Sequence, residues 1–282
     1  MTDCQSLATS IFFESDWLER LLEECEREAI DYRNMKLLNQ EGRTAVWNVC
    51  EMFGILTHGV PGQACRLLQR YLYKLLRSHR NIRDHDAQVA LIETILPRFL
   101  LMMTCCVQLA AKMNSADTYN SASLIRIALL TKGVSYTTEE IILTEAEIFK
   151  ALDYRIPLWT SVDMGEMLAA GLKLPSEVIK TVAPIVDLAE YYQTDIEEKV
   201  FWVANLSDTT QFVGGVRTLH LSAGAVAAAV RLSPYQTDPA PILAQLLRIP
   251  RSYVECLRDI ILKKILSYRN EPKLLKRKYS SS

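Results

Sequence analysis

Lys112 is the charged residue whose sequence position most strongly favours a specific contact. It follows the apolar stretch "CCVQLAA" at 105–111, in which small and medium side chains are not interrupted by a charge. A lysine is almost never fully buried without a partner. We therefore expect Lys112 at the rim of a core helix, where its ammonium group can bind either another element of this chain or another protein.

Two other segments contain side chains that could bind a metal or react as thiols. His79, Asp84, His85 and Asp86 carry side chains that can bind metals, but arginines interrupt the segment and would repel a cation. Cys105 and Cys106 are adjacent and would point in different directions on a helix, and the sequence contains no Cys-x-x-Cys pair. We expect no metal site, and we expect these thiols to be buried and unreactive.

No set of catalytic residues is recognisable. The sequence lacks a glycine-rich dinucleotide loop, a phosphate loop, a His-Glu-x-x-His pair and a nucleophile elbow. It therefore predicts a binding protein that is not an enzyme and has no cofactor.

The elements that would position Lys112 are helical almost throughout. Apolar residues recur at helical spacing, and strand signals are nearly absent. The pattern predicts an all-α fold of two tandem five-helix bundles with an N-terminal helix. The predicted parts are a helical extension at 1–40, a first bundle at 41–158, a second bundle at 159–270 and a disordered basic tail at 271–282.

Within that plan, two segments carry more specific expectations. The N-terminal helix, amphipathic between residues 14 and 33, is expected either to face a partner or to pack on another part of this chain. Residues 194–216 are expected to form an irregular insert ahead of a small-residue helix at 220–230.

Composition narrows the class of protein further. The chain has 282 residues, of which 49% are hydrophobic and 23% charged, with a net charge of −1 and seven cysteines. A near-neutral balance argues against direct nucleic-acid binding, which usually needs a basic excess. The absence of a secretory apolar region or a bilayer-length apolar run predicts an intracellular protein outside the membrane.

Two phrases together resemble the cyclin box. "CVQLAAK" ends in Lys112, and "EAEIFKALDYRI" begins at Glu145 and contains Phe149. In cyclins a small-residue central helix ends in such a lysine, and a later helix carries such a glutamate. "RLLQRYL" at 66–72 resembles the preceding cyclin helix, so the resemblance covers about 43–160. Within the cyclins, the chain is similar to the cyclin N-terminal domain-containing family of meiotic crossover factors.

The resemblance implies that the N-terminal helix packs on the first bundle, as is common in cyclins. It also implies a mechanism and partners. Lys112, Glu145 and Phe149 would bind a cyclin-dependent kinase, with the charged pair holding the kinase's regulatory helix. Meiotic recombination proteins would be further partners, and the location would be the nucleus, on chromosomes at recombination sites. Without the resemblance, Lys112 and Glu145 would be read as an intramolecular surface salt bridge, worth about 0–1 kcal/mol.

The match to cyclins departs from the family pattern at the substrate-docking patch. Cyclins that dock substrates carry a Met-Arg-Ala-Ile-Leu phrase, but here "GRTAVWNVC" retains only Arg43 and Trp47 as candidates for such a patch. Two alternatives therefore stay open. One is a cyclin-fold scaffold that recruits recombination factors without activating a kinase. The other is a DNA-bound use of the cyclin box, similar to transcription factor IIB, against which the near-neutral charge and the missing zinc ribbon count.

Overall fold

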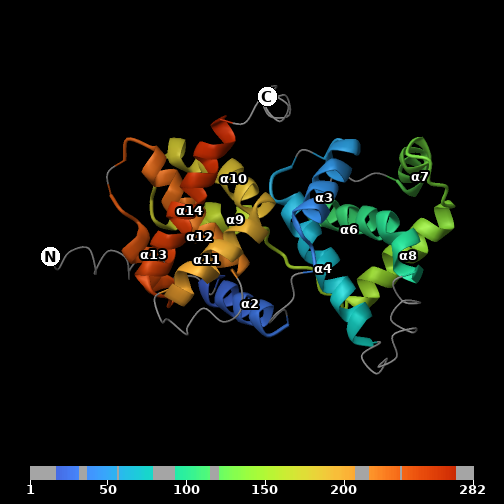
Figure 1. The fold of residues 1–282 in the computed structure, drawn as a ribbon, viewed down its shortest axis with the longest axis horizontal. Coiled ribbons are helices and arrows are strands. Elements are labelled where there is room, and N and C mark those ends of the chain that lie inside the picture. Colours follow the sequence, from blue (N-terminus) through green and yellow to red (C-terminus); the bar gives the residue numbers. More distant parts are fainter. Residues whose placement is uncertain are drawn as a thin grey trace. The chain divides into compact units, whose positions relative to one another are not determined.

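The computed structural model describes residues 17–31, 37–55, 57–78, 93–114, 121–206, 216–235 and 237–270. These residues form twelve α-helices and one 3-10 turn, with no strand among them (Figure 1). The prediction of an all-α fold is confirmed. The chain divides into two compact units, residues 28–161 and residues 1–27 with 162–282, here called the first and second units.

The first unit is built around one central helix. Its helices are α3 (Gln40–Met52), α4 (Val60–Ser78), α6 (Phe99–Asn114), α7 (Ala122–Thr131) and α8 (Thr138–Ala151), with the 3-10 turn η1 (Leu96–Arg98) leading into α6. Every residue of α6 from Leu101 to Ala111 is buried, and the helix packs on α3, α4 and α8. Small side chains such as Ala110 and Cys106 let these neighbours approach closely.

Helix α6 and its lead-in would be long and apolar enough to cross a membrane by length and composition alone. Of the most apolar window between Glu93 and Asn114, however, 61% is buried inside the protein. Such burial is typical of the core helix of a globular bundle, and it agrees with the helix's central place in the first unit.

Helix boundaries in this unit follow local sequence signals. Thr137 caps α8, since its hydroxyl accepts a hydrogen bond from the Glu140 backbone N–H and the Glu140 carboxylate accepts one from the Thr137 backbone N–H. Pro61 lies in the first turn of α4, where its missing N–H costs nothing. Helix α8 ends at Ala151, well before Pro157, which disfavours helical backbone only at Ile156.

The second unit repeats the plan of a buried small-residue helix. Its helices are α2 (Trp17–Asp31), α9 (Ser161–Gly171), α10 (Ser176–Tyr191), α11 (Gln193–Leu206), α12 (Thr218–Leu232), α13 (Ala240–Leu246) and α14 (Arg251–Asn270). Helix α12 is buried from Thr218 to Val230. Gly224 permits the close approach of α14, because a Cβ atom added there would lie 2.7 Å from the Cβ of Leu257.

The expected packing of the N-terminal helix on the first bundle is wrong. Helix α2 belongs to the second unit as far as Arg27. Its Cys25 Sγ lies 3.8 Å from Nε2 of His220 on α12, and Arg248 donates a 2.5 Å hydrogen bond to Glu19. An amphipathic pattern shows that one helix face must be buried, but it does not show against which neighbour.

The expected irregular insert at 194–216 is also wrong in its first half. Residues 193–206 form α11, in which Ile196 and Val200 are buried four residues apart. Lys199 pairs with Asp195 along the same helix, at 2.9 Å. A short helix held by two buried side chains gives a weak periodic signal, and polar residues on its other face obscure it further.

Several predictions fall outside the described residues. They include the metal-candidate segment with His79, Asp84, His85 and Asp86, the second half of the insert, and the basic tail at 271–282. Among the residues that the structure describes, no cluster of three or more His, Cys, Asp or Glu side chains could hold a metal ion.

Candidate functional site

The candidate site is centred on Lys112 and Glu145, which come from different helices. Lys112 lies in the last turn of α6 and Glu145 near the middle of α8, and the packing of these two helices brings the side chains together. Lys112 Nζ lies 2.5 Å from Glu145 Oε1. The two side chains are 38% and 22% exposed, so the pair lies at the surface and remains open to a partner.

Apolar side chains adjoin this charged pair along the chain. Phe149 follows Glu145 by one helical turn and packs partly against the core of the unit. Its ring meets that of Tyr154 edge to face, with centroids 5.2 Å apart. Tyr154 is 64% exposed and Met113, next to Lys112, is 44% exposed. The site therefore offers a charged pair beside exposed apolar surface.

The position of Tyr154 depends on an unusual turn after α8. Asp153 and Tyr154 both have a positive φ, of 55° and 57°. Backbone hydrogen bonds from Tyr154 N to Phe149 O and from Leu152 N to Ile148 O close this turn. Left-handed conformations are uncommon for residues other than glycine. The turn brings the Tyr154 ring back onto Phe149.

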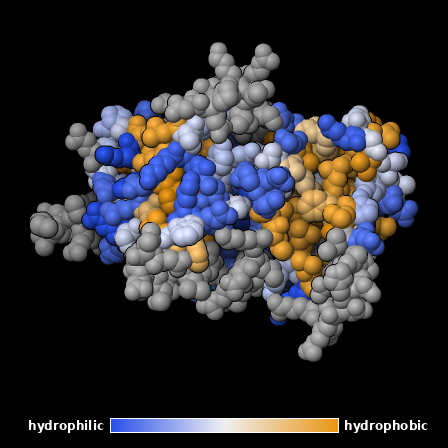
Figure 2. Space-filling model, viewed as in Figure 1, coloured by the Kyte–Doolittle hydropathy of each residue, from blue (hydrophilic) through white to orange (hydrophobic). Residues whose placement is uncertain are grey.

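Hydrophobic residues are also exposed over a wider area of the first unit. Figure 2 shows them on the visible face around α4 and α6. Exposed large apolar side chains of α4, α6 and α8 are Leu76, Met113, Ile142 and Leu143. Apolar patches rimmed by polar groups commonly mark protein-binding surfaces.

A network of side-chain hydrogen bonds holds α8 in place, and with it Glu145. The Tyr71 hydroxyl of α4 donates a 2.6 Å hydrogen bond to Glu147 Oε1. Arg98 of η1 donates to Glu147 Oε2 at 3.2 Å and to Thr144 Oγ1 at 3.1 Å. Burial, followed by the contact with the Glu147 carboxylate, raises the pKa of Tyr71 well above its usual value. Tyr71 therefore stays protonated and keeps its role as a donor.

A second set of hydrogen bonds fixes the end of α6 that carries Lys112. The Asn114 amide donates to the Ala110 carbonyl at 2.7 Å and to the Gln63 side-chain oxygen. Gln63, fully buried in α4, donates in turn to the Pro157 carbonyl at 2.7 Å. One glutamine thus ties the end of α6 to the segment that follows α8. Hydrogen bonds to neighbouring segments therefore hold both α6 and α8, the two helices of the site.

Arg43 and Trp47, the candidates for a docking patch, lie on α3. Arg43 is only 3% exposed, and its guanidinium donates a 3.2 Å hydrogen bond to Gln69 of α4. Trp47 is half-buried and packs against the hydrophobic core. Substrate docking at these two residues stays a prediction.

The cysteines of α6 have an environment that disfavours reactivity. Cys105 and Cys106 are both fully buried. Burial raises the pKa of the Cys105 thiol to about 12 and raises that of Cys106 as well. A thiolate, the reactive form, is therefore strongly disfavoured at neutral pH.

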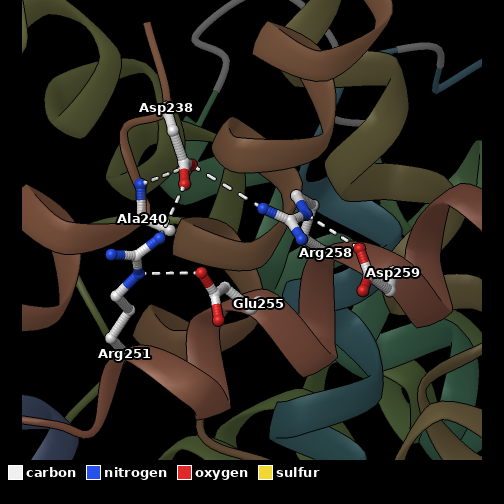
Figure 3. Close-up of polar contacts among 6 residues, drawn as sticks. All are labelled: Asp238, Ala240, Arg251, Glu255, Arg258 and Asp259. Carbon is white, nitrogen blue, oxygen red and sulfur yellow. Dashed lines mark hydrogen bonds and ion pairs between the residues drawn. The ribbon is translucent and has the colours of Figure 1, made fainter.

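The second unit holds a cluster of charges where α13 and α14 begin (Figure 3). The Asp238 carboxylate accepts a hydrogen bond from Ala240 N at 3.1 Å and lies 3.4 Å from Arg251 and 3.7 Å from Arg258. Arg251 also pairs with Glu255 at 2.8 Å. Because Asp238 accepts a hydrogen bond from the first residue of α13 while its arginine partners lie on α14, the cluster serves the fold of this unit.

Comparisons with known proteins identify relatives in sequence. No family model matches the chain. Cyclin N-terminal domain-containing protein 1 of Homo sapiens is 28% identical over 122 residues, and that of Mus musculus is 29% identical over 122 residues. Each alignment covers 40% of this chain, and 37% and 36% of the two relatives. The match thus spans little more than a third of either relative's length.

The structural comparison covers far more of the chain. The X-ray structure of a viral cyclin from herpesvirus saimiri matches it with a TM-score of 0.52 and 16% sequence identity. That match covers 87% of this chain and 96% of the viral cyclin. At this identity the likeness concerns the fold.

Proposed function

We propose, from the cyclin fold of this chain and its distant relation to Cyclin N-terminal domain-containing protein 1, that it binds a cyclin-dependent kinase through the Lys112–Glu145 site. Its fold is that of a class of kinase regulators that are not enzymes. The observation that carries the proposal is the pairing of Lys112 with Glu145, 33 residues apart in sequence and 2.5 Å apart in space.

The geometry of the site suits the end of a partner helix. The ammonium can bind carbonyl groups that a helix leaves unpaired at its C-terminal end, and the carboxylate can bind N–H groups that a helix leaves unpaired at its N-terminal end. Met113 and Tyr154 supply exposed apolar surface for the side chains of the same helix. In a kinase, fixing one regulatory helix allows the ion pair and metal site of the catalytic centre to assemble.

We further propose a role in meiotic crossover formation, in the nucleus and on chromosomes at recombination sites. This finer role rests on the resemblance of "CVQLAAK" and "EAEIFKALDYRI" to the family of meiotic crossover factors. Meiotic recombination proteins would then be further partners.

The test is a binding measurement with purified cyclin-dependent kinases. The variant is the double charge reversal Lys112→Glu/Glu145→Lys, in which the internal salt bridge can form again with opposite polarity. Loss of kinase binding in this variant would therefore report on recognition, and a thermal melt would verify that the variant is folded. Arg27→Glu/Glu23→Arg on α2 is the matched control, since that exposed pair is 3.1 Å apart.

The expected result is kinase binding by the wild type and by the control, and its loss in the variant. A kinase assay on the bound complex then shows whether binding also activates. Binding that survives the reversal would contradict the assignment of the site.

A second candidate function is a cyclin-fold scaffold that recruits recombination factors without activating a kinase. The burial of Arg43 against Gln69 favours it, because a cyclin that docks substrates needs an exposed docking patch. Absence of binding to every kinase tested, together with capture of recombination proteins, would support the scaffold.

A further inference from the structure

Helix α7 in the first unit is apolar on two opposite sides. Ile125 and Leu129 are buried, and the helix packs on α8. Leu124, Ile127 and Leu130 are exposed by 53%, 54% and 57%. With about 3.6 residues per turn, residues three apart lie on one stripe, and Ile127 lies roughly opposite the two buried residues.

Such a helix is unusual at a protein surface. A surface helix normally shows one apolar stripe toward the core and polar residues on the other side. Single exposed leucines are common, but an aligned row of three forms a continuous apolar strip, which is a feature of many protein-binding surfaces. We call Leu124, Ile127 and Leu130 the α7 stripe.

The size of the α7 stripe fits one helix. Helix α7 has ten residues, so it is about 15 Å long. A stable interface between two protein copies needs roughly 20–30 residues on each side, far more than this stripe supplies. A partner helix that lays one apolar face along the stripe needs only a few anchoring side chains.

The charges around α7 indicate what kind of partner helix would bind the α7 stripe. From Ser121 to Thr137 the chain carries Arg126 and Lys132, and no acidic residue. Both basic residues are exposed. A partner with acidic residues beside its apolar stripe would gain from both charges, whereas a basic partner would be repelled.

We propose that the α7 stripe binds an amphipathic helix of a partner protein whose apolar face is flanked by acidic residues. The stripe lies on a different helix from Lys112 and Glu145. The proposal therefore does not depend on kinase binding, and the two can fail separately.

The test uses two synthetic helical peptides with the same leucine stripe, one flanked by glutamates and one by lysines. Binding of each labelled peptide to the full chain is measured by fluorescence anisotropy at low and high salt. The variant is Ile127→Glu, which places a charge in the middle of the stripe. The matched control is Leu266→Glu on α14, at a residue that is 55% exposed.

We expect the glutamate peptide to bind the wild type about tenfold more tightly than the lysine peptide, with the difference shrinking at high salt. Ile127→Glu should weaken the glutamate peptide about tenfold or more, as for loss of a central anchor, while Leu266→Glu should not.

Three results would overturn the proposal. They are equal or absent binding of the two peptides, a dimer in light scattering that Ile127→Glu abolishes, and loss of kinase binding in Ile127→Glu. The dimer would assign the stripe to a second copy of the chain, and the kinase result would assign it to the kinase site.

Discussion

The ion pair between Lys112 and Glu145 contributes little to the stability of the folded protein. Both side chains are partly exposed, and exposed pairs contribute only about 0–1 kcal/mol to folding. Their positions are set by other residues: Asn114 and Gln63 hold the end of α6, and the Glu147 network holds α8. The pair is therefore free to serve a partner without loss to the fold.

His220 makes the opposite contribution, since its effect is on stability. It is 6% exposed on α12, with Cys25 of α2 and the Tyr253 ring of α14 against it. Burial, and secondarily the charge of Arg217, lower the pKa of His220 from 6.5 to about 3. The folded protein therefore keeps this imidazole neutral at pH values where the unfolded chain protonates it.

The sign of the pH dependence follows. Between pH 6.5 and about 3 the unfolded state binds up to one more proton at His220 than the folded state, so stability falls as the pH drops through this range. The expected loss from this group approaches about 1.4 kcal/mol per pH unit. Urea unfolding between pH 7.5 and 5 measures it, and His220→Gln should flatten the dependence. The exposed His58, changed to Gln, is the control, and an unchanged slope in His220→Gln would contradict the assignment.

At the scale of the helix, local chemistry determines where α8 begins. Thr137 and Glu140 form a reciprocal pair of hydrogen bonds at its N-terminus. The Glu140 carboxylate accepts hydrogen bonds from the Thr137 backbone N–H and hydroxyl, and these bonds lower the pKa of Glu140 below its usual value. The carboxylate thus stays charged at the positive end of the helix, where the helix dipole favours it.

Thr137→Ala should remove this cap and lower the free energy of unfolding by about 1 kcal/mol. Thr131→Ala is the control, because the Thr131 hydroxyl donates only to the Ala128 carbonyl at the end of α7. Chemical denaturation of both variants gives the comparison. Equal losses in the two variants would show that the capping box adds nothing.

Helix ends were predictable from sequence because caps and prolines act over a few residues. Thr137 stands directly before α8, and Pro61 lies in the first turn of α4. The neighbour of α2 and the helical state of α11 were not predictable, since both depend on which distant surface buries a short apolar face. The same limit applies to the site. Lys112 and Glu145 stand in recognisable phrases, but nothing near Gln63 in the sequence points to Asn114 or Pro157.

At the scale of the whole molecule, two units use one plan. Each surrounds a buried small-residue helix, α6 in the first and α12 in the second. Sequence similarity to the relatives covers 40% of the chain, whereas likeness to the viral cyclin covers 87%. Packing of this kind tolerates extensive hydrophobic substitution provided that volume and pattern are kept, so the fold extends beyond the recognisable residues.

Helix α2 gives a test of which unit its burial stabilises. Leu18, Leu21, Leu22 and Cys25 are buried, and the contacts of α2 with His220 and Arg248 lie within the second unit. Removing residues 1–27 should therefore increase amide hydrogen exchange in α12 and α14 and leave α6 unchanged. Hydrogen exchange followed by mass spectrometry measures the change separately in α6, α12 and α14. Faster exchange in α6 than in α12 would contradict the assignment.

Gly224 offers a way to study this protein in a living organism before any partner is identified. A Cβ at this residue would meet the Cβ of Leu257, an atom close to the backbone that cannot easily move aside. Overpacking of this kind costs about 1–3 kcal/mol, a large share of the roughly 5–15 kcal/mol that holds a protein folded. Gly224→Ala should thus behave as a temperature-sensitive allele, active in the cold and lost on warming. Warming the organism at chosen stages would show when the protein is needed. The substitution itself leaves the binding surfaces unchanged.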